Sequence, residues 1–300
     1  MLNKAERFSN SEYPALLLIS AAYNEQNLLD LCYETEIFRR NYMRRLIFCL
    51  AGAVLLVLPS VTLAQEVTSD TPRQVLFVGN SYFYYNDSLH NHLNRMLAEA
   101  EGRDDDDLLP FRSIAISGGS LSHHPFAHYM APGAIGYDEP FDAVVLAGHS
   151  AAGNSDDRRT AFREAVLTAN EVISEHGAKT VLYMTHAYGE GHEDYDPEMM
   201  HNLASLYTEV GAEIDATVIP VGLAFAKAYE QRPDLKLHVE FDHSHPNLAG
   251  SYLAAATALT SLYDISPVGL TYDYYGRLDT ETTTFLQEIA ADTVAEFSGS

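Results

Sequence analysis

The chain has 300 residues, of which 42 are acidic and 18 are basic, so its formal net charge is -24. A hydrophobic fraction of 47% is typical of a globular protein and excludes the disordered and collagen-like classes. The acidic balance argues against a nucleic-acid partner, because a phosphate backbone binds clustered Lys and Arg side chains.

An export signal is predicted near the start of the chain. Two arginines and an apolar run follow Met43, and the small residues Thr62 and Ala64 stand just before polar Gln65. This order is typical of a secretory signal peptide, here cleaved after Ala64, with an uncleaved anchor as the alternative. We therefore expect a secreted or periplasmic protein. The expected segments are a non-native extension, a signal peptide and one domain, at 1–42, 43–64 and 65–300.

The cysteines limit the chemistry of the mature chain. Both of them, Cys32 and Cys49, precede the predicted cleavage site. A thiol nucleophile and a Cys-ligated zinc are therefore not expected in the exported protein. The segment before Gln65 has six basic and six acidic side chains, so the whole net negative charge belongs to the exported domain.

Short β-rich runs alternate with segments of helical period along the rest of the chain. Strands are expected at 75–78, 113–116, 143–146, 180–184 and 217–220. Helices with one apolar face are expected at 89–100, 162–173, 196–210 and 247–259. This alternation predicts an α/β fold: a single doubly wound domain with a central parallel sheet of about five strands, flanked by helices.

Polar motifs stand where the first three strands end and just before the last helix. They are Gly79-Asn80-Ser81, Ser117-Gly118-Gly119-Ser120, Gly148-His149-Ser150 and Asp242-His243-Ser244-His245. Ligands of such sheets bind beyond the carboxyl ends of the strands. A serine nucleophile needs an imidazole base, a carboxylate that orients the imidazole, and N–H donors for the oxyanion. These motifs contain all of those groups.

The motifs, in this order, resemble the SGNH (GDSL-like) hydrolase superfamily over nearly all of residues 74–270. The family places its nucleophilic serine directly after the first strand, where this chain has Ser81. Its last block is Asp-x-x-His, matched by Asp242 and His245. The resemblance implies a flavodoxin-like three-layer sandwich and a Ser-His-Asp mechanism. Ser81 would attack the substrate, His245 would transfer the proton, and Asp242 would orient His245.

The same resemblance implies an oxyanion hole. Its expected donors are the N–H groups of Ser81 and Gly118, with Gly119 as the alternative to Gly118. The third block of the family contains an asparagine donor, but this chain has Ser150 at that position. The hydroxyl of Ser150 would replace the asparagine, with His149 as the alternative.

The predicted function is an exported serine esterase that hydrolyses carboxylic esters, with O-acetyl groups on carbohydrate as the expected substrates. One alternative is an α/β-hydrolase, because the sequence around Ser150 resembles a nucleophile elbow. Another is a catalytically weak glycan-binding protein on the same fold. The expected partner is a small-molecule or carbohydrate ester. No nucleic acid, no membrane span after signal cleavage and no cofactor are expected.

The remaining histidines and aromatic residues leave two questions open. His123, His124 and His128 are expected to line the substrate side of the second loop, and no metal site is expected. The aromatic run at 82–85 follows Ser81 directly, and it serves either as packing of the first helix or as a surface on which a sugar or acyl group stacks.

Overall fold

The computed structural model describes residues 71–104 and 107–299, all within one of the two units into which the chain divides. The predicted extension, signal peptide and cleavage site, together with Cys32 and Cys49, lie outside the described residues. In the described part of the chain, no helix is both long and apolar enough to cross a membrane.

A five-stranded parallel sheet forms the centre of the domain, which confirms the predicted fold class. The strand order is β2-β1-β3-β4-β5. The strands are β1 Val75–Gly79, β2 Arg112–Ala115, β3 Ala143–Ala147, β4 Lys179–Tyr183 and β5 Thr217–Ile219. The sheet extends from β1 to β2 on one side, and from β3 to β4 and β5 on the other. The boundary between β1 and β3 is therefore the switch point, where doubly wound sheets form their ligand-binding crevice.

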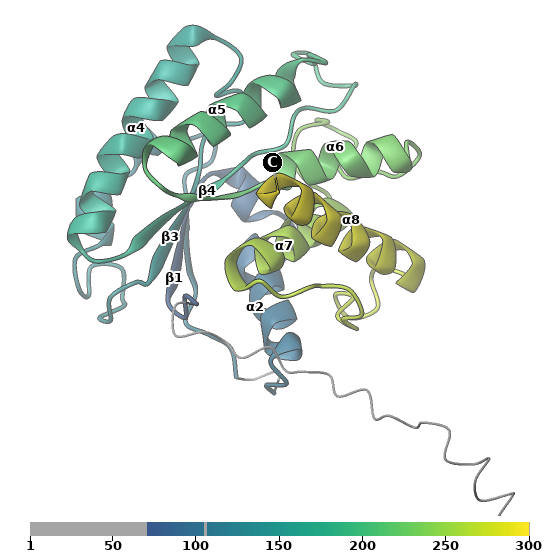
Figure 1. Cartoon of the computed structure of the whole chain (residues 1–300), viewed down its shortest axis with the longest axis horizontal. Coiled ribbons are helices and arrows are strands. Elements are labelled where there is room, and N and C mark those ends of the chain that lie inside the picture. Colours follow the sequence, from purple (N-terminus) through teal and green to yellow (C-terminus); the bar gives the residue numbers. More distant parts are fainter. Residues whose placement is uncertain (1–70, 105–106, 300) are drawn as a thin grey trace, which may run out of the picture. The chain divides into compact units, whose positions relative to one another are not determined.

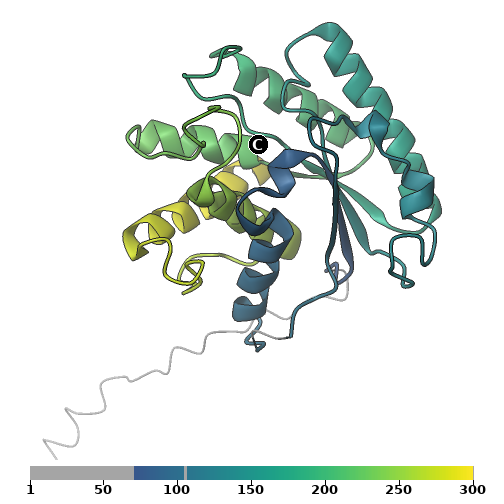
Figure 2. The same cartoon turned by 180° about the vertical axis from the view of Figure 1, so that it is seen from behind.

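Helices cover both faces of the sheet, as Figures 1 and 2 show from opposite sides. Alternate strand residues point to opposite faces, so Phe77 and Val145 enter one hydrophobic core whereas Val78 and Leu146 enter the other. The first core includes residues of α2 Leu89–Ala100, α6 Val221–Gln231, α7 Leu248–Tyr263 and α8 Thr280–Ser298. The second includes residues of α3 Phe126–Tyr129, α4 Asp156–Glu175 and α5 Met199–Glu213.

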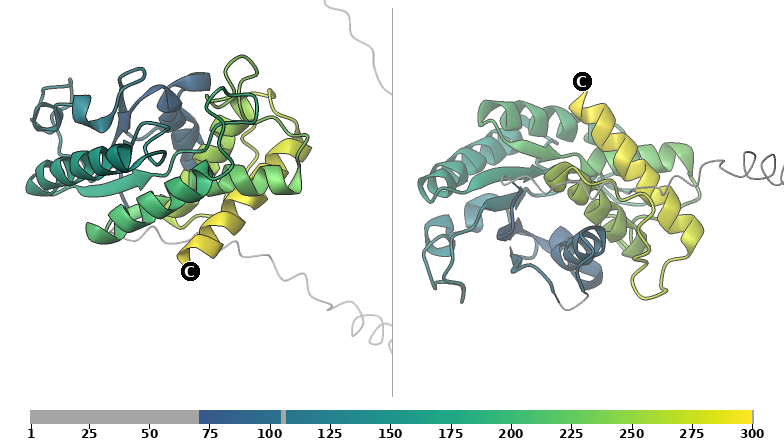
Figure 3. Two further views of the ribbon diagram at one scale, coloured as in Figure 1. Left: turned by 90° about the horizontal axis from the view of Figure 1, so that it is seen from above. Right: turned by 60° about the horizontal axis from the view of Figure 1, so that its bottom comes forward.

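Three of these helices are not among the elements expected from the sequence, namely the four-residue α3 and the longer α6 and α8. α6 directly follows β5 and begins Val-Gly, so its start carries no polar capping signal. α8 contains five threonines, whose β-branched side chains have weak helix propensity. Packing stabilises α8 despite its weak helix propensity, because this helix lies against α7, as Figure 3 shows.

Gly250, near the start of α7, marks a tight approach between two segments. A Cβ atom at this position would lie 2.3 Å from the carbonyl oxygen of Leu237 and 2.9 Å from the ring of Phe225. We expect Gly250→Ala to lower the free energy of unfolding by about 1–3 kcal/mol, because overpacking forces the backbone to shift. Thermal unfolding measures the change, with Gly299→Ala as control, since a Cβ there meets only an ordinary contact at 3.4 Å. Equal melting temperatures of the two variants would contradict this account.

Candidate active site

Asn80 fixes the loop that carries Ser81. β1 ends at Gly79, and the side chain of Asn80 then caps a short 3-10 helix, Ser81–Phe83, by accepting from the Tyr82 N–H at 3.1 Å. The Asn80 amide also donates to the Gly148 carbonyl at 3.0 Å and to the Gly119 carbonyl at 3.3 Å. This single buried side chain therefore joins the loops that follow β1, β2 and β3.

A tight loop before α7 presents the carboxylate and the imidazole. Asp242 Oδ1 accepts from the backbone N–H groups of Ser244 and His245, at 2.9 and 3.0 Å. Burial alone would raise the pKa of Asp242, but these hydrogen bonds and the His245 ring outweigh it and lower the pKa below its ordinary value. The carboxylate is therefore ionised at neutral pH.

The structure brings Ser81, His245 and Asp242 into one hydrogen-bonded chain. His245 Nδ1 lies 2.6 Å from Asp242 Oδ2, and His245 Nε2 lies 2.7 Å from Ser81 Oγ. Because an ionised carboxylate only accepts, Nδ1 carries the ring proton and Nε2 accepts from the Ser81 hydroxyl. Ser81 and His245 are 164 positions apart in sequence, yet both lie at the carboxyl end of the sheet. This is the arrangement of a nucleophile, a base and a group that orients the base.

Two aromatic rings enclose the imidazole of His245. The Tyr85 ring stacks on it at 4.2 Å between centroids with a 13° interplanar angle, and the Tyr82 ring meets it edge-on at 5.5 Å. The first ring covers one face of the imidazole and restricts its rotation. The aromatic run after Ser81 therefore takes part in packing at the site itself.

Removing the Tyr85 ring should allow the His245 imidazole to rotate more freely. We expect Tyr85→Leu to lower kcat/KM by about two- to tenfold, the equivalent of one aromatic contact, whereas Tyr85→Phe keeps the stacked ring and stays near wild type. Hydrolysis of the esters expected from the sequence, at saturating and limiting substrate concentration, measures the effect. A Phe variant as impaired as the Leu variant would assign the effect to the lost hydroxyl and contradict the stacking role.

Buried side chains hold the loop that contains Asp242 and His245, called the Asp-His loop below. Tyr82 stacks on His186 at 4.4 Å, and its hydroxyl lies 2.8 Å from the Ser244 hydroxyl. His186 Nε2 donates to the Ser244 carbonyl at 2.9 Å. Burial lowers the pKa of His186 well below its ordinary value, so this ring is neutral and acts as a structural donor. Both contacts fix the residue that precedes His245.

The backbone N–H groups expected to receive an oxyanion differ in the hydrogen bonds they make. In the described part of the chain, the N–H groups of Ser81 and Gly118 donate no hydrogen bond, whereas Gly119 donates to the Ile116 carbonyl at 2.9 Å. Gly118 has a φ of +64°, which glycine adopts without strain. Of the two glycines considered from the sequence, Gly118 is therefore the one with a free donor.

Ser150 and His149 make other contacts. The Ser150 hydroxyl is buried and lies 2.7 Å from the Tyr188 hydroxyl. The His149 Nδ1 atom accepts from the Ala151 N–H at 3.1 Å, and burial, then Arg158, lower the pKa of His149. Among the described residues, Ser150 has no histidine as a hydrogen-bond partner. These contacts favour Ser81 over Ser150 as the nucleophile, and a donor role of Ser150 or His149 stays a prediction.

The histidines of the second loop do not all face substrate as expected. His124 is buried, and its Nε2 donates to the Gly79 carbonyl at 2.9 Å, so it supports the end of β1. His123 and His128 are exposed. The description of His124 as a substrate-lining residue is therefore wrong. In residues 71–104 and 107–299, no group of three or more His, Cys, Asp or Glu side chains could hold a metal ion.

Several solved structures are similar to this chain. A DUF4886 family protein from Bacteroides uniformis is 19% identical and has a TM-score of 0.57, with 74% of this chain and 94% of that chain covered. A protein described as a candidate SGNH hydrolase from Slackia heliotrinireducens is 24% identical, with a TM-score of 0.48 over 63% of this chain and 97% of that chain. An acetyl xylan esterase is 16% identical, with a TM-score of 0.48 over 63% of this chain and 99% of that chain.

SGNH-type structures are thus among those similar to this chain. At these identities the comparisons concern the fold. No family model matches the chain, and no curated protein matches it.

Proposed function

We propose that this protein is a serine esterase of SGNH type that hydrolyses carboxylic esters. The observation that carries the proposal is the unbroken series of hydrogen bonds from Asp242 through His245 to the hydroxyl of Ser81. A buried hydroxyl that merely stabilised a loop would not need an imidazole oriented by an ionised carboxylate. The rigid support of Ser81 by Asn80 fits a preorganised nucleophile.

The geometry suits a two-step acyl transfer. The Ser81 oxygen attacks the ester carbonyl carbon while its proton passes to His245 Nε2, and the N–H groups of Ser81 and Gly118 receive the oxyanion. The tetrahedral intermediate then collapses, and the alcohol leaves with the proton from His245. Water attacks the acyl-enzyme with His245 as base, which releases the carboxylic acid and restores the Ser81 hydroxyl. Asp242 stays ionised and holds the ring throughout.

O-acetyl groups on carbohydrate are the substrates we propose. The exposed ring of Tyr84 lies beside Tyr85, at 5.7 Å between centroids and 23° between planes, next to the catalytic imidazole. Exposed aromatic faces beside a nucleophile are surfaces on which the apolar face of a sugar ring can pack.

A panel of p-nitrophenyl esters of increasing acyl length, together with acetylated oligosaccharides, tests the proposal. We expect p-nitrophenyl acetate and the acetylated sugars to be turned over. Absence of hydrolysis across the panel, with the protein folded, would favour the glycan-binding alternative instead.

Export is a separate proposal that the signal-like sequence from Met43 to Ala64 supports. We expect the native secreted form to begin near Gln65. Intact-mass measurement of that form checks the cleavage site. A product that stays in the cytoplasm and retains residues 1–42 would contradict export.

A further inference from the structure

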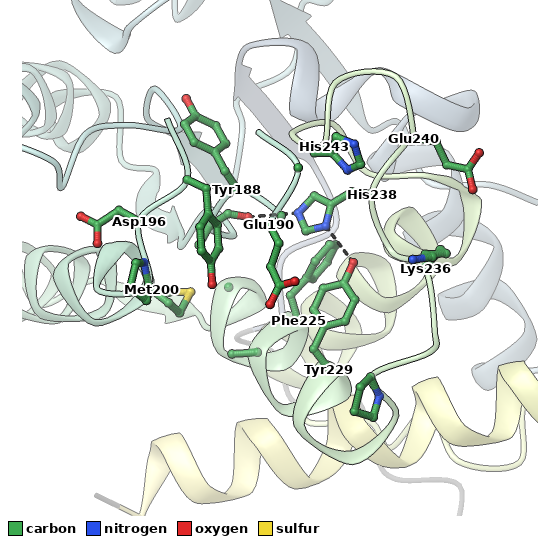
Figure 4. A pocket seen from close by; sticks show the side chains of 18 residues that line it. Tyr188, Glu190, Asp196, Met200, Phe225, Tyr229, Lys236, His238, Glu240 and His243 are labelled. Carbon is green, nitrogen blue, oxygen red and sulfur yellow. Dashed lines mark hydrogen bonds between the residues drawn. The ribbon is translucent and has the colours of Figure 1, made fainter. Parts of the chain in front are cut away.

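A cavity of about 680 Å³ lies beside the candidate active site, and Figure 4 shows it from close by. It lies between the segment after β4, the segment before α5, one face of α6 and residues 233–243. Ser81, Asp242 and His245 do not line it. A volume of this size accepts a ligand of two or three sugar rings.

The cavity and the catalytic residues share one loop. His243 lines the cavity, while its neighbour Asp242 holds the catalytic imidazole. The Gly189 N–H donates to the His243 carbonyl at 2.7 Å. A Cβ on Gly191 would lie 2.3 Å from the His243 ring, so the two segments are closely packed. A ligand in the cavity would thus lie directly behind the Asp-His loop.

Aromatic rings form much of the cavity wall. Tyr188, Phe225 and Tyr229 line it, and Tyr195 adds a ring that is 42% exposed. The Tyr229 hydroxyl donates to His238 Nδ1 at 2.8 Å, and His238 Nε2 donates to the Ala187 carbonyl at 3.0 Å. The wall is therefore fixed before any ligand binds, and burial lowers the pKa of His238 to about 4, so the ring is uncharged.

The polar groups of the cavity include both acceptors and a donor. Glu190, Asp196 and Glu240 supply carboxylates, and Lys236 supplies an ammonium group. In Figure 4 the Glu190 side chain extends into the space between Tyr188 and Tyr229, with Asp196 and Lys236 on opposite sides. In the described part of the chain none of these four groups has an ion-pair partner.

These groups select the class of ligand. The excess of carboxylates repels phosphates and uronates, and a simple cation offers no acceptor to the Lys236 ammonium group. A neutral polyol offers hydroxyls that donate to the carboxylates and accept from Lys236, and apolar ring faces that pack on tyrosine and phenylalanine. Such a ligand would contact both the charged groups and the aromatic rings of the cavity.

We propose that this cavity binds an unesterified segment of a neutral oligosaccharide, and that it anchors the sugar chain whose ester is presented to Ser81. The inference rests on the proposed esterase function for the identity of the substrate. The binding site itself does not require that Ser81 be reactive.

Calorimetry of the purified protein with xylotetraose, cellotetraose and mannotetraose tests the site. We expect at least one of these neutral sugars to bind, and tetragalacturonate and tetramethylammonium not to bind. Absence of binding by all three neutral sugars, or binding of tetramethylammonium in their place, would overturn the proposal.

Two exposed residues allow the site to be changed without disturbing the fold. Tyr195→Ala removes a ring and Glu190→Gln removes a charged acceptor, and we expect each to weaken sugar binding about five- to tenfold. The matched controls are Tyr275→Ala, an exposed tyrosine outside the cavity, and Glu171→Gln, an exposed carboxylate of α4. Equal loss in the controls, or no loss in the cavity variants, would contradict the assignment.

Activity on two substrates separates this inference from the proposed function. We expect Tyr195→Ala and Glu190→Gln to raise the KM for an acetylated oligosaccharide about fivefold and to leave kcat/KM for p-nitrophenyl acetate, which has no sugar, within twofold. An unchanged KM for the acetylated oligosaccharide would overturn the anchoring role. A wild-type protein that binds sugar but hydrolyses neither ester would refute the esterase and leave the binding site in place.

Discussion

Ser81→Ala is expected to lower the turnover of any ester substrate by several orders of magnitude. The alanine has no oxygen to attack the carbonyl, and the members of a Ser-His-Asp set act as one unit. The His245 ring would lose its partner at 2.7 Å but keep its bond to Asp242, so the fold should stay intact. Steady-state hydrolysis of p-nitrophenyl acetate measures the loss, and thermal unfolding verifies that the variant is folded.

Ser150→Ala is the matched control for this result. Ser150 is also a buried serine at the end of a strand, but its hydroxyl bonds to Tyr188 instead of a histidine. We expect the variant to stay active, with turnover slowed if the hydroxyl assists the oxyanion. If Ser150→Ala were inactive and Ser81→Ala active, the α/β-hydrolase interpretation would be correct.

Asp242→Asn is expected to lower kcat/KM about 10³- to 10⁴-fold at neutral pH. The carboxylate accepts from His245 Nδ1 and thereby keeps Nε2 free to take the proton of Ser81. An amide that donates to Nδ1 would move the ring proton to Nε2, where it blocks the base. Hydrolysis rates across pH measure the effect. An Asn variant with wild-type activity would show that His245 needs no carboxylate.

The pH profile of the wild-type protein follows from the same geometry. An imidazole acts as a base only when it is unprotonated, so kcat/KM should fall toward acid pH. The pKa of Asp242 lies below its ordinary value because hydrogen bonds outweigh burial, so the carboxylate stays ionised through that fall. The contribution of the ionised Asp242 carboxylate to stability is complete at pH values above the ordinary carboxyl pKa. It is lost only as the pH falls through the lowered pKa of Asp242. A rate independent of pH from 5 to 9, with chemistry rate-limiting, would exclude His245 as the base.

Sequence patterns predict those parts of this fold that depend on local order. Each of the five strands is a short β-rich run, and each expected range lies within about one residue of the observed bounds. Asp242 and His245 are three positions apart, so a single turn brings them together. The position of Ser81 at the end of β1 follows from the motif Gly79-Asn80-Ser81, whose residues are consecutive.

The supporting contacts could not be predicted, because they join distant segments. Asn80 lies in a recognised motif, yet its bond to Gly148 spans 68 positions. The stack of Tyr82 on His186 depends on how β4 and its loop pack beside β1. His124 was expected at the substrate, and its burial beneath the end of β1 has no signal in the surrounding residues.

The central claim is that Ser81 is an activated nucleophile, and covalent labelling tests it most directly. A fluorophosphonate reacts only with an activated serine oxygen, which displaces fluoride from phosphorus, and peptide mass spectrometry then locates the adduct. We predict one adduct, on Ser81, that is lost in Ser81→Ala and kept in Ser150→Ala. An adduct on Ser150, or no adduct on the folded protein, would contradict the account.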